Sequence, residues 1–240
     1  MATYFGTAAS EIFLLFDHTE GDVIFGGGFS PTPNPSPGSD FILAGRGNDT
    51  IYGDYGSDAA FGGAGDDVIF GFGAAGPTPG AVDRLAGTDQ GDYLDGGPGN
   101  DRIVAAGGDD IVFGGAGDDV QYGGSGADWI HAGPGDDTIS SGAGADRLWG
   151  GAGRDLFVYG YSPTSNQYAH DAEDGTDTIL DFTSGTDSID LRGYAIREQA
   201  LQVADTPCGL ELHFRAVADP AQINLTGVHA LQPGDIIFYV

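Results

Sequence analysis

Short hydrophobic triplets alternate with hexads rich in glycine and aspartate along residues 44–158, in a period of nine residues. The blocks GGAGDDVIF (62–70) and GGPGNDRIV (96–104) show the period most clearly. The middle residue of the triplet is apolar almost throughout while its neighbours are mixed, which is the alternation of a half-buried strand. Glycines at the first, second and fourth positions allow the positive φ angles that tight turns need. The pattern therefore predicts three-residue strands joined by six-residue turns.

One strand and one turn make half of a flattened coil, so two nonapeptides complete a circuit and residues eighteen apart stack. Stacked strands lie about 4.8 Å apart. The chain is therefore predicted to be all-β, with its core made by the eighth position of each repeat. Gln121 departs from this pattern, because it occupies an eighth position where an inward apolar residue is expected. The predicted core residues are Ile42, Ile51, Ile69, Leu94, Ile103, Val112, Ile130, Ile139, Leu148 and Phe157.

The period divides the chain into three predicted parts. Residues 1–16 are expected to form an N-terminal cap strand, residues 17–158 the repeat stack, and residues 159–240 a β-rich C-terminal cap. Loop insertions are expected near 26–38 and 71–80, where proline and glycine interrupt the period.

Charge limits the partners, since the 240 residues include 36 acidic and only 8 basic side chains, for a formal net charge of -28. Nucleic acid and anionic membranes repel such a chain, whereas cations are attracted to it. The single cysteine, Cys208, excludes an internal disulfide. No apolar run approaches the roughly 18 residues of a membrane span. The apolar patch near the start contains Glu11, unlike a Sec signal peptide.

An aspartate stands at the sixth position of nearly every repeat, in phase with the strands. Calcium binds hard oxygen ligands at about 2.4 Å, so an ion between two stacked turns lies within reach of both. The preference of aspartate for glycine-rich turns does not explain why the residue recurs at the same position in so many repeats. The fifth-position aspartates, such as Asp66 and Asp118, are interpreted as solvated. The predicted calcium ligands are Asp40, Asp49, Asp58, Asp67, Asp83, Asp92, Asp101, Asp110, Asp119, Asp128, Asp137, Asp146 and Asp155.

These repeats follow the pattern G-G-x-G-x-D-x-U-x and thereby resemble the RTX (repeats-in-toxin) calcium-binding proteins. The resemblance implies a right-handed parallel β-roll that holds multiple Ca2+ ions. After the repeats, FVYGYSPTS and DGTDTILDFTSGTDSIDLRGY are similar to the C-terminal region of serralysin-type proteins, and LTGVHALQPGDIIFYV is similar to their export signals. This similarity implies a secreted protein that engages the type I secretion machinery. Asp177, Asp181 and Asp187 in this region are candidates for a further ion site.

The outer faces of the coil are assigned by counting 78–86 and 87–95 as two weaker repeats. Alternate repeats then belong to alternate sheets, and one sheet presents an aromatic face of the kind that usually marks an interface. Coverage of this face by the proline-rich loops or the C-terminal segment is the alternative. The expected members of this binding face are Tyr52, Phe70, Tyr93, Phe113, Trp129 and Trp149.

No catalytic constellation accompanies the repeats. The HExxH motif of the serralysin proteases is missing, and GFGAAG at 71–76 leads into PTPG instead of a helix. We therefore expect a calcium-binding protein that is not an enzyme, folds outside the cell, and adheres or self-assembles in a surface layer, matrix or biofilm. A calcium-dependent carbohydrate-binding module is the alternative, so the expected partner is either the protein itself or a polysaccharide.

Overall fold

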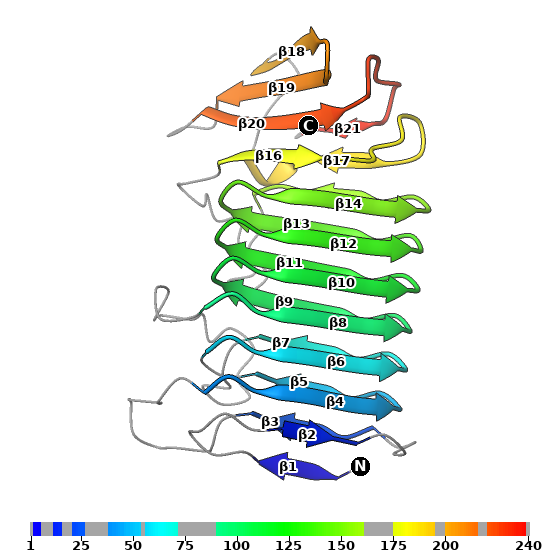
Figure 1. Cartoon of the computed structure of the whole chain (residues 1–240). Coiled ribbons are helices and arrows are strands. Elements are labelled where there is room, and N and C mark those ends of the chain that lie inside the picture. The colour runs from blue at the N-terminus through cyan, green and yellow to red at the C-terminus, as the bar shows by residue number, and fades with distance from the viewer. Residues whose placement is uncertain are drawn as a thin grey trace.

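The computed structural model describes residues 2–5, 12–15, 21–26, 38–53, 56–71, 90–160, 175–194, 200–215 and 220–238. These residues form strands and turns, apart from one 3-10 helix at Arg192–Tyr194. The strands stack along a single axis in two sheets, and the chain passes from one sheet to the other at almost every turn (Figure 1). The predicted all-β parallel β-roll is confirmed.

The two sheets take alternate strands of the chain, and all pairs are parallel except β18 with β19 and β19 with β20. Within the described residues, sheet 1 runs β1 (Thr3–Phe5), β3 (Val23–Phe25), β5 (Thr50–Tyr52), β7 (Val68–Phe70), β9 (Arg102–Gly107), β11 (Val120–Ser125), β13 (Thr138–Ala143), β15 (Leu156–Val158), β17 (Ser188–Asp190) and β21 (Ile236–Ile237). Sheet 2 runs β2 (Ile12–Leu14), β4 (Phe41–Arg46), β6 (Ala59–Ala64), β8 (Tyr93–Pro98), β10 (Ile111–Ala116), β12 (Trp129–Pro134), β14 (Arg147–Ala152), β16 (Thr176–Ile179), β20 (Pro220–Thr226), β19 (Gly209–Arg215) and β18 (Leu201–Thr206).

Neighbouring strands of the repeat region pair at the separation that the period predicts. Val112 of β10 lies opposite Ile130 of β12, and Gln121 of β11 lies opposite Ile139 of β13. The middle residue of each triplet points between the sheets, where one continuous core forms. The predicted core residues all belong to it and are buried, as are Ile24, Ile179 and Ile189 at either end.

Glycine is required in the turns for two separate reasons, both visible at Gly65. Its φ angle is +141°, in a region that residues with a Cβ rarely adopt. A Cβ on Gly65 would also lie 2.1 Å from the carbonyl oxygen of Gly47, the equivalent residue of the neighbouring rung. The close stacking of the rungs therefore leaves no room for a side chain at this position.

The connection between the two clear blocks of repeats supplies one rung, not two. β7 pairs directly with β9, with Phe70 opposite Val104. Among the described residues of this connection, only those of the copy at 87–95 contribute a strand, β8, and residues 72–89 lie outside the described part of the chain. The interpretation of 78–86 as a separate rung of the stack is wrong, because β6 and β8 are adjacent in sheet 2 with no strand between them.

This missing rung corrects the predicted faces. Between β7 and β8 the chain crosses from one sheet to the other once less than predicted. The repeats before the insertion therefore lie on the opposite sheet from the one expected by counting back from the later repeats. Of the six predicted face residues, Tyr52 and Phe70 lie on sheet 1, whereas Tyr93, Phe113, Trp129 and Trp149 lie on sheet 2. The prediction that all six share one face is therefore wrong.

The stack continues past the last nonapeptide. β16 pairs with β14, β17 pairs with β15, and β21 pairs with β17, all in parallel. β20 joins β16 in parallel, and β19 and β18 extend sheet 2 in antiparallel fashion. The C-terminal region thus covers the end of the repeat core with further rungs. In the part of the chain that the structure describes, no helix is long and apolar enough to cross a membrane.

Candidate calcium sites along the turns

The sixth-position aspartates form two ladders, one along each column of turns. The backbone N–H of Asp101 donates to Oδ1 of Asp119 over 2.8 Å, and the same contact repeats from rung to rung. The first ladder, in the turns from sheet 2 to sheet 1, consists of Asp22, Asp49, Asp67, Asp101, Asp119, Asp137, Asp155 and Asp187. The second ladder, in the turns from sheet 1 to sheet 2, consists of Asp40, Asp58, Asp92, Asp110, Asp128, Asp146 and Asp177.

The ladders bring together every predicted ligand except Asp83, which lies outside the described residues. Asp22 is not among the predicted ligands, because a proline-rich insertion follows its repeat, although it precedes the strand triplet Val23–Phe25 in the same way as its counterparts. Of the C-terminal candidates, Asp177 and Asp187 join different ladders. The carboxylate of Asp181 instead accepts the N–H groups of two glycines at the start of the last repeat turn. The signal that identifies these extra members is an aspartate at the start of a short strand, without the paired glycines at the first and second positions of the repeat.

The second carboxylate oxygen of many ladder residues is buried and accepts no hydrogen bond. A buried carboxylate oxygen that has lost its water and gained no partner is costly. It therefore requires a proton or a cation. The residues whose Oδ2 atoms lie in this situation include Asp67, Asp101, Asp119, Asp128, Asp137 and Asp155.

At the turns of Asp67, Asp101, Asp119 and Asp128, a backbone carbonyl of the next rung converges with this oxygen at the start of the turn. An ideal Cβ on Gly62 would lie 2.3 Å from Oδ2 of Asp67 and 2.8 Å from the carbonyl oxygen of Gly96. On Gly96 itself, the Cβ would lie 2.3 Å from Oδ2 of Asp101 and 2.6 Å from the carbonyl oxygen of Gly114. Glycine at the first position thus keeps open a cradle of carboxylate and carbonyl oxygens, which are the hard donors that calcium prefers.

Carboxylates alone do not make the site. In the described residues, no three His, Cys, Asp or Glu side chains group together around a possible metal position. A cation between two turns therefore depends on backbone carbonyls as well as on the ladder carboxylates, and the residues present fit calcium in that mixed form.

Burial raises the pKa of the ladder carboxyls. The pKa of Asp119 rises to about 7, chiefly because the group is desolvated and further because Asp101 and Asp137 lie close to it. Desolvation likewise raises the pKa of Asp128 to about 7 and that of Asp101 to about 6. Without a bound cation, charge on these ladders is therefore strongly opposed near neutral pH.

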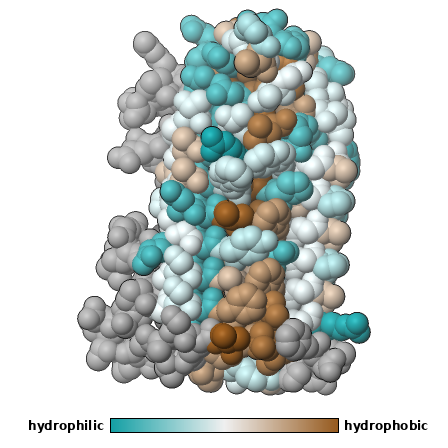
Figure 2. All heavy atoms as spheres, in the orientation of Figure 1, coloured by the Kyte–Doolittle hydropathy of each residue, from teal (hydrophilic) through white to brown (hydrophobic). Residues whose placement is uncertain are grey.

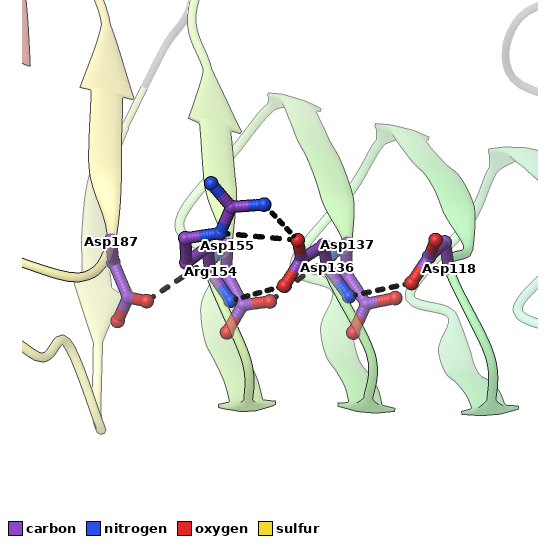
Figure 3. Close-up of polar contacts among 6 residues, drawn as sticks. All are labelled: Asp118, Asp136, Asp137, Arg154, Asp155 and Asp187. Carbon is purple, nitrogen blue, oxygen red and sulfur yellow. Dashed lines mark hydrogen bonds and ion pairs between the residues drawn. The ribbon is translucent and has the colours of Figure 1, made fainter.

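An exposed row of fifth-position side chains runs beside the first ladder. The N–H of Asp136 donates to Oδ1 of Asp118, and the N–H of Arg154 donates to Oδ1 of Asp136, both over 2.9 Å (Figure 3). These carboxylates reach the following rung, whereas the sixth-position carboxylates reach the preceding one. The guanidinium of Arg154 also holds the pKa of Asp136 below its usual value through a side-chain hydrogen bond. The fifth-position residues thus link the rungs from the solvent side.

The outer face of sheet 2 carries a column of rings that passes from rung to rung. Successive ring centroids lie 5.4–6.3 Å apart, and most ring planes are inclined to their neighbours. Figure 2 shows an apolar strip along this side of the stack, most continuous towards the N-terminal end. The column consists of Phe41, Phe61, Tyr93, Phe113, His131 and Trp149, with Trp129 beside Trp149.

The sequence comparisons agree with this site. The family model described as RTX calcium-binding nonapeptide repeat (4 copies) matches residues 36–73, 86–121 and 122–157, the part of the chain that carries most of both ladders. The chain therefore contains RTX calcium-binding nonapeptide repeats folded as a β-roll.

Solved structures include further proteins that the chain resembles. One is the solution structure of the AlgE6R3 subunit from the Azotobacter vinelandii mannuronan C5-epimerase. The two sequences are 28% identical, the match covers 54% of this chain and 78% of that chain, and the TM-score is 0.40. The comparison with curated proteins gave no match.

Proposed function

We propose that this chain is a secreted protein whose β-roll folds when it binds calcium outside the cell and that then acts as a self-associating structural protein of a surface layer or matrix. The observation that carries the proposal is the convergence of buried, unpartnered carboxylate oxygens, such as Oδ2 of Asp67 and Asp101, with carbonyl oxygens of the next rung. The proposed role is not catalytic.

The two oxygens of each ladder carboxylate have different tasks in this proposal. Oδ1 accepts the amide of the neighbouring rung and sets the register, while Oδ2 and the turn carbonyls hold the ion. Bound calcium supplies the positive charge that neutralises the ladders. Where calcium is scarce, as in the cytoplasm, the buried carboxylates repel one another and the chain stays unfolded, which suits passage through a type I export channel. Binding and folding are then one event outside the cell.

The outer face of sheet 2 supports the self-associating role. Trp129 is 49% exposed, Ile111 40% and Phe41 39%, all on this one face. Contiguous exposed apolar side chains commonly mark a contact surface. The formal charge of -28 opposes association of two copies, so the face is expected to act only after calcium has neutralised the ladders.

A calcium-dependent carbohydrate-binding module is the second candidate, and ring geometry favours sheet 2 for it as well. On sheet 1 the rings of Phe25 and Tyr52 stack with an interplanar angle of 3°, which covers their faces. On sheet 2 the rings of Trp129 and Trp149 are inclined by 53°, and Trp129 is 49% exposed with the guanidinium of Arg147 over its ring at 5.4 Å from the centroid. A neutral polysaccharide suits the acidic chain better than an acidic one.

Light scattering and electron microscopy of the calcium-loaded protein test the two roles. The wild type is expected to form ordered particles or sheets, Trp129→Ala to lose them, and Tyr122→Ala, an aromatic change on the opposite sheet, to keep them. A calcium-loaded wild type that stays monomeric contradicts self-association. If that monomer binds a glycan and Trp129→Ala does not, the carbohydrate-binding role replaces it.

A further inference from the structure

Among the described repeats, one eighth position, the middle of the strand triplet, carries a polar side chain, and this is Gln121 in β11. Its neighbours on sheet 1 are Ile103 and Ile139, which lie directly opposite it in β9 and β13. Gln121 is fully buried, and neither its Oε1 nor its Nε2 atom has a hydrogen-bond partner. A buried amide that forms no hydrogen bond is costly, and an aliphatic residue of similar size would avoid the cost. Its presence therefore calls for a function.

The amide of Gln121 points into one of the oxygen cradles. An ideal Cβ on Gly114 would lie 2.4 Å from Oδ2 of Asp119, 2.5 Å from the amide nitrogen of Gln121 and 2.6 Å from the carbonyl oxygen of Ala132. Three polar atoms thus surround one point at the mouth of this turn. The point itself is one bond length from the glycine Cα, so it marks where the three groups converge and not where an ion sits.

The equivalent cradles have at most two polar atoms among their three nearest atoms. At Gly96 the two nearest atoms are Oδ2 of Asp101 and the carbonyl oxygen of Gly114, and the third is a carbon of Asp101. The residue that corresponds to Gln121 in that turn is Ile103. The cradle at Gly114 therefore differs from its neighbour by one amide group.

We propose that Gln121 is a calcium ligand, through its Oε1 atom, in the site formed by Asp119 and the carbonyl of Ala132. The inference rests on the proposed calcium binding and adds a specific ligand outside the nonapeptide pattern. Oxygen and nitrogen of a glutamine amide exchange places by rotation about the last side-chain bond, so Oε1 reaches the position now held by Nε2. Amide oxygens are among the donors that calcium accepts. The amide makes this site different in composition from those with an aliphatic residue at the eighth position.

Calcium titration by calorimetry, with the bound calcium counted by elemental analysis after dialysis, tests the proposal. Gln121→Leu restores the usual apolar residue, so it is expected to fold with calcium but to lose one ion or to bind one ion at least tenfold more weakly. Ile139→Leu, the matched change one rung away, is expected to keep the wild-type number and affinity. A Gln121→Leu protein with unchanged number and affinity overturns the proposal.

The variant Gln121→Glu distinguishes two possible roles of Gln121, as a calcium ligand or only as a hydrogen-bond donor. If Oε1 binds calcium, the added charge strengthens binding at this site at least severalfold. If the amide serves only to donate to Oδ2 of Asp119, the glutamate repels that carboxylate, and weaker binding or failure to fold in saturating calcium overturns the proposal. This comparison also decides the matter should Gln121→Leu fail to fold. A wild type that binds no calcium instead contradicts the proposed function as a whole.

Discussion

The backbone N–H of Asp119 donates to Oδ1 of Asp137 over 2.8 Å, while Oδ2 of Asp119 is buried without a hydrogen-bond partner. Adjacent rungs are thus joined by one oxygen of each carboxylate, and the other oxygen is left for a cation. The register of the roll and its capacity for calcium consequently depend on the same side chain.

Removal of a sixth-position carboxylate of a ladder is expected to lower the stability of the fold far more than removal of the fifth-position carboxylate that precedes it in the sequence. Asp119→Ala deletes the acceptor for the N–H of Asp101 and a proposed ion ligand, so we expect a loss of about 2 kcal/mol or more in unfolding free energy with saturating calcium, together with fewer bound ions. Asp118→Ala removes an exposed acceptor for the N–H of Asp136 and is expected to cost less than about 1 kcal/mol. Urea denaturation of both variants measures the difference, and equal losses contradict the ladder.

Acidification is expected to stabilise the calcium-free protein. The pKa of Asp119 is about 7 in the folded chain and that of Asp101 about 6, against an ordinary value of 3.8. At a pH between the ordinary and the raised pKa, the folded state binds more protons than the unfolded state. The free energy of unfolding of the calcium-free protein therefore increases as pH falls and decreases as pH rises through the folded pKa. Thermal melts after dialysis against calcium-free buffer are expected to show more structure at pH 5 than at pH 7.5.

With calcium present, acidification is expected to destabilise the protein instead, because protons compete with the ion for the same carboxylate oxygens. Calcium affinity measured by calorimetry should therefore fall between pH 7.5 and pH 5. A calcium-free protein whose melting temperature rises with pH across this interval is incompatible with protonated ladders.

Glycine in the turns is expected to be irreplaceable because of stacking, beyond its backbone conformation. Gly65→Ala places a Cβ 2.1 Å from the carbonyl oxygen of Gly47, whereas Gly227, with φ of +76°, has nothing within 4 Å of the corresponding point. Gly227→Ala should cost about 1–2 kcal/mol from backbone strain alone, and Gly65→Ala clearly more. Calcium-saturated thermal melts compare the two variants, and matching melting temperatures would refute the steric contribution.

The nonapeptide period predicted the repetitive part of the fold well, since the spacing of Asp, Gly and the apolar middle residue has one simple structural solution. Ile103 and Ile139 are in the core for the reason given by the period. The outer faces were mispredicted because an insertion can be counted as a rung or as a loop, and only the direct pairing of β7 with β9 decides this.

The ladders extend further than the pattern indicated. Asp22, Asp177 and Asp187 lack the glycines at the first and second positions of the repeat, yet stacking on Asp49, Asp146 and Asp155 gives them the same amide contact. The role proposed for Gln121 was equally hidden, because its sequence position identifies only a departure from the pattern and not the carboxylate and carbonyl oxygens that lie beside it.

Far-ultraviolet circular dichroism during a calcium titration tests the central claim most directly. At pH 7.5 the chelated protein is expected to give the spectrum of an unfolded chain and to convert to a β spectrum as calcium rises to millimolar levels, with the transition reversed by chelator. A β spectrum that is the same with calcium and with chelator would contradict the account, because the roll would then form without any cation to neutralise its buried carboxylates.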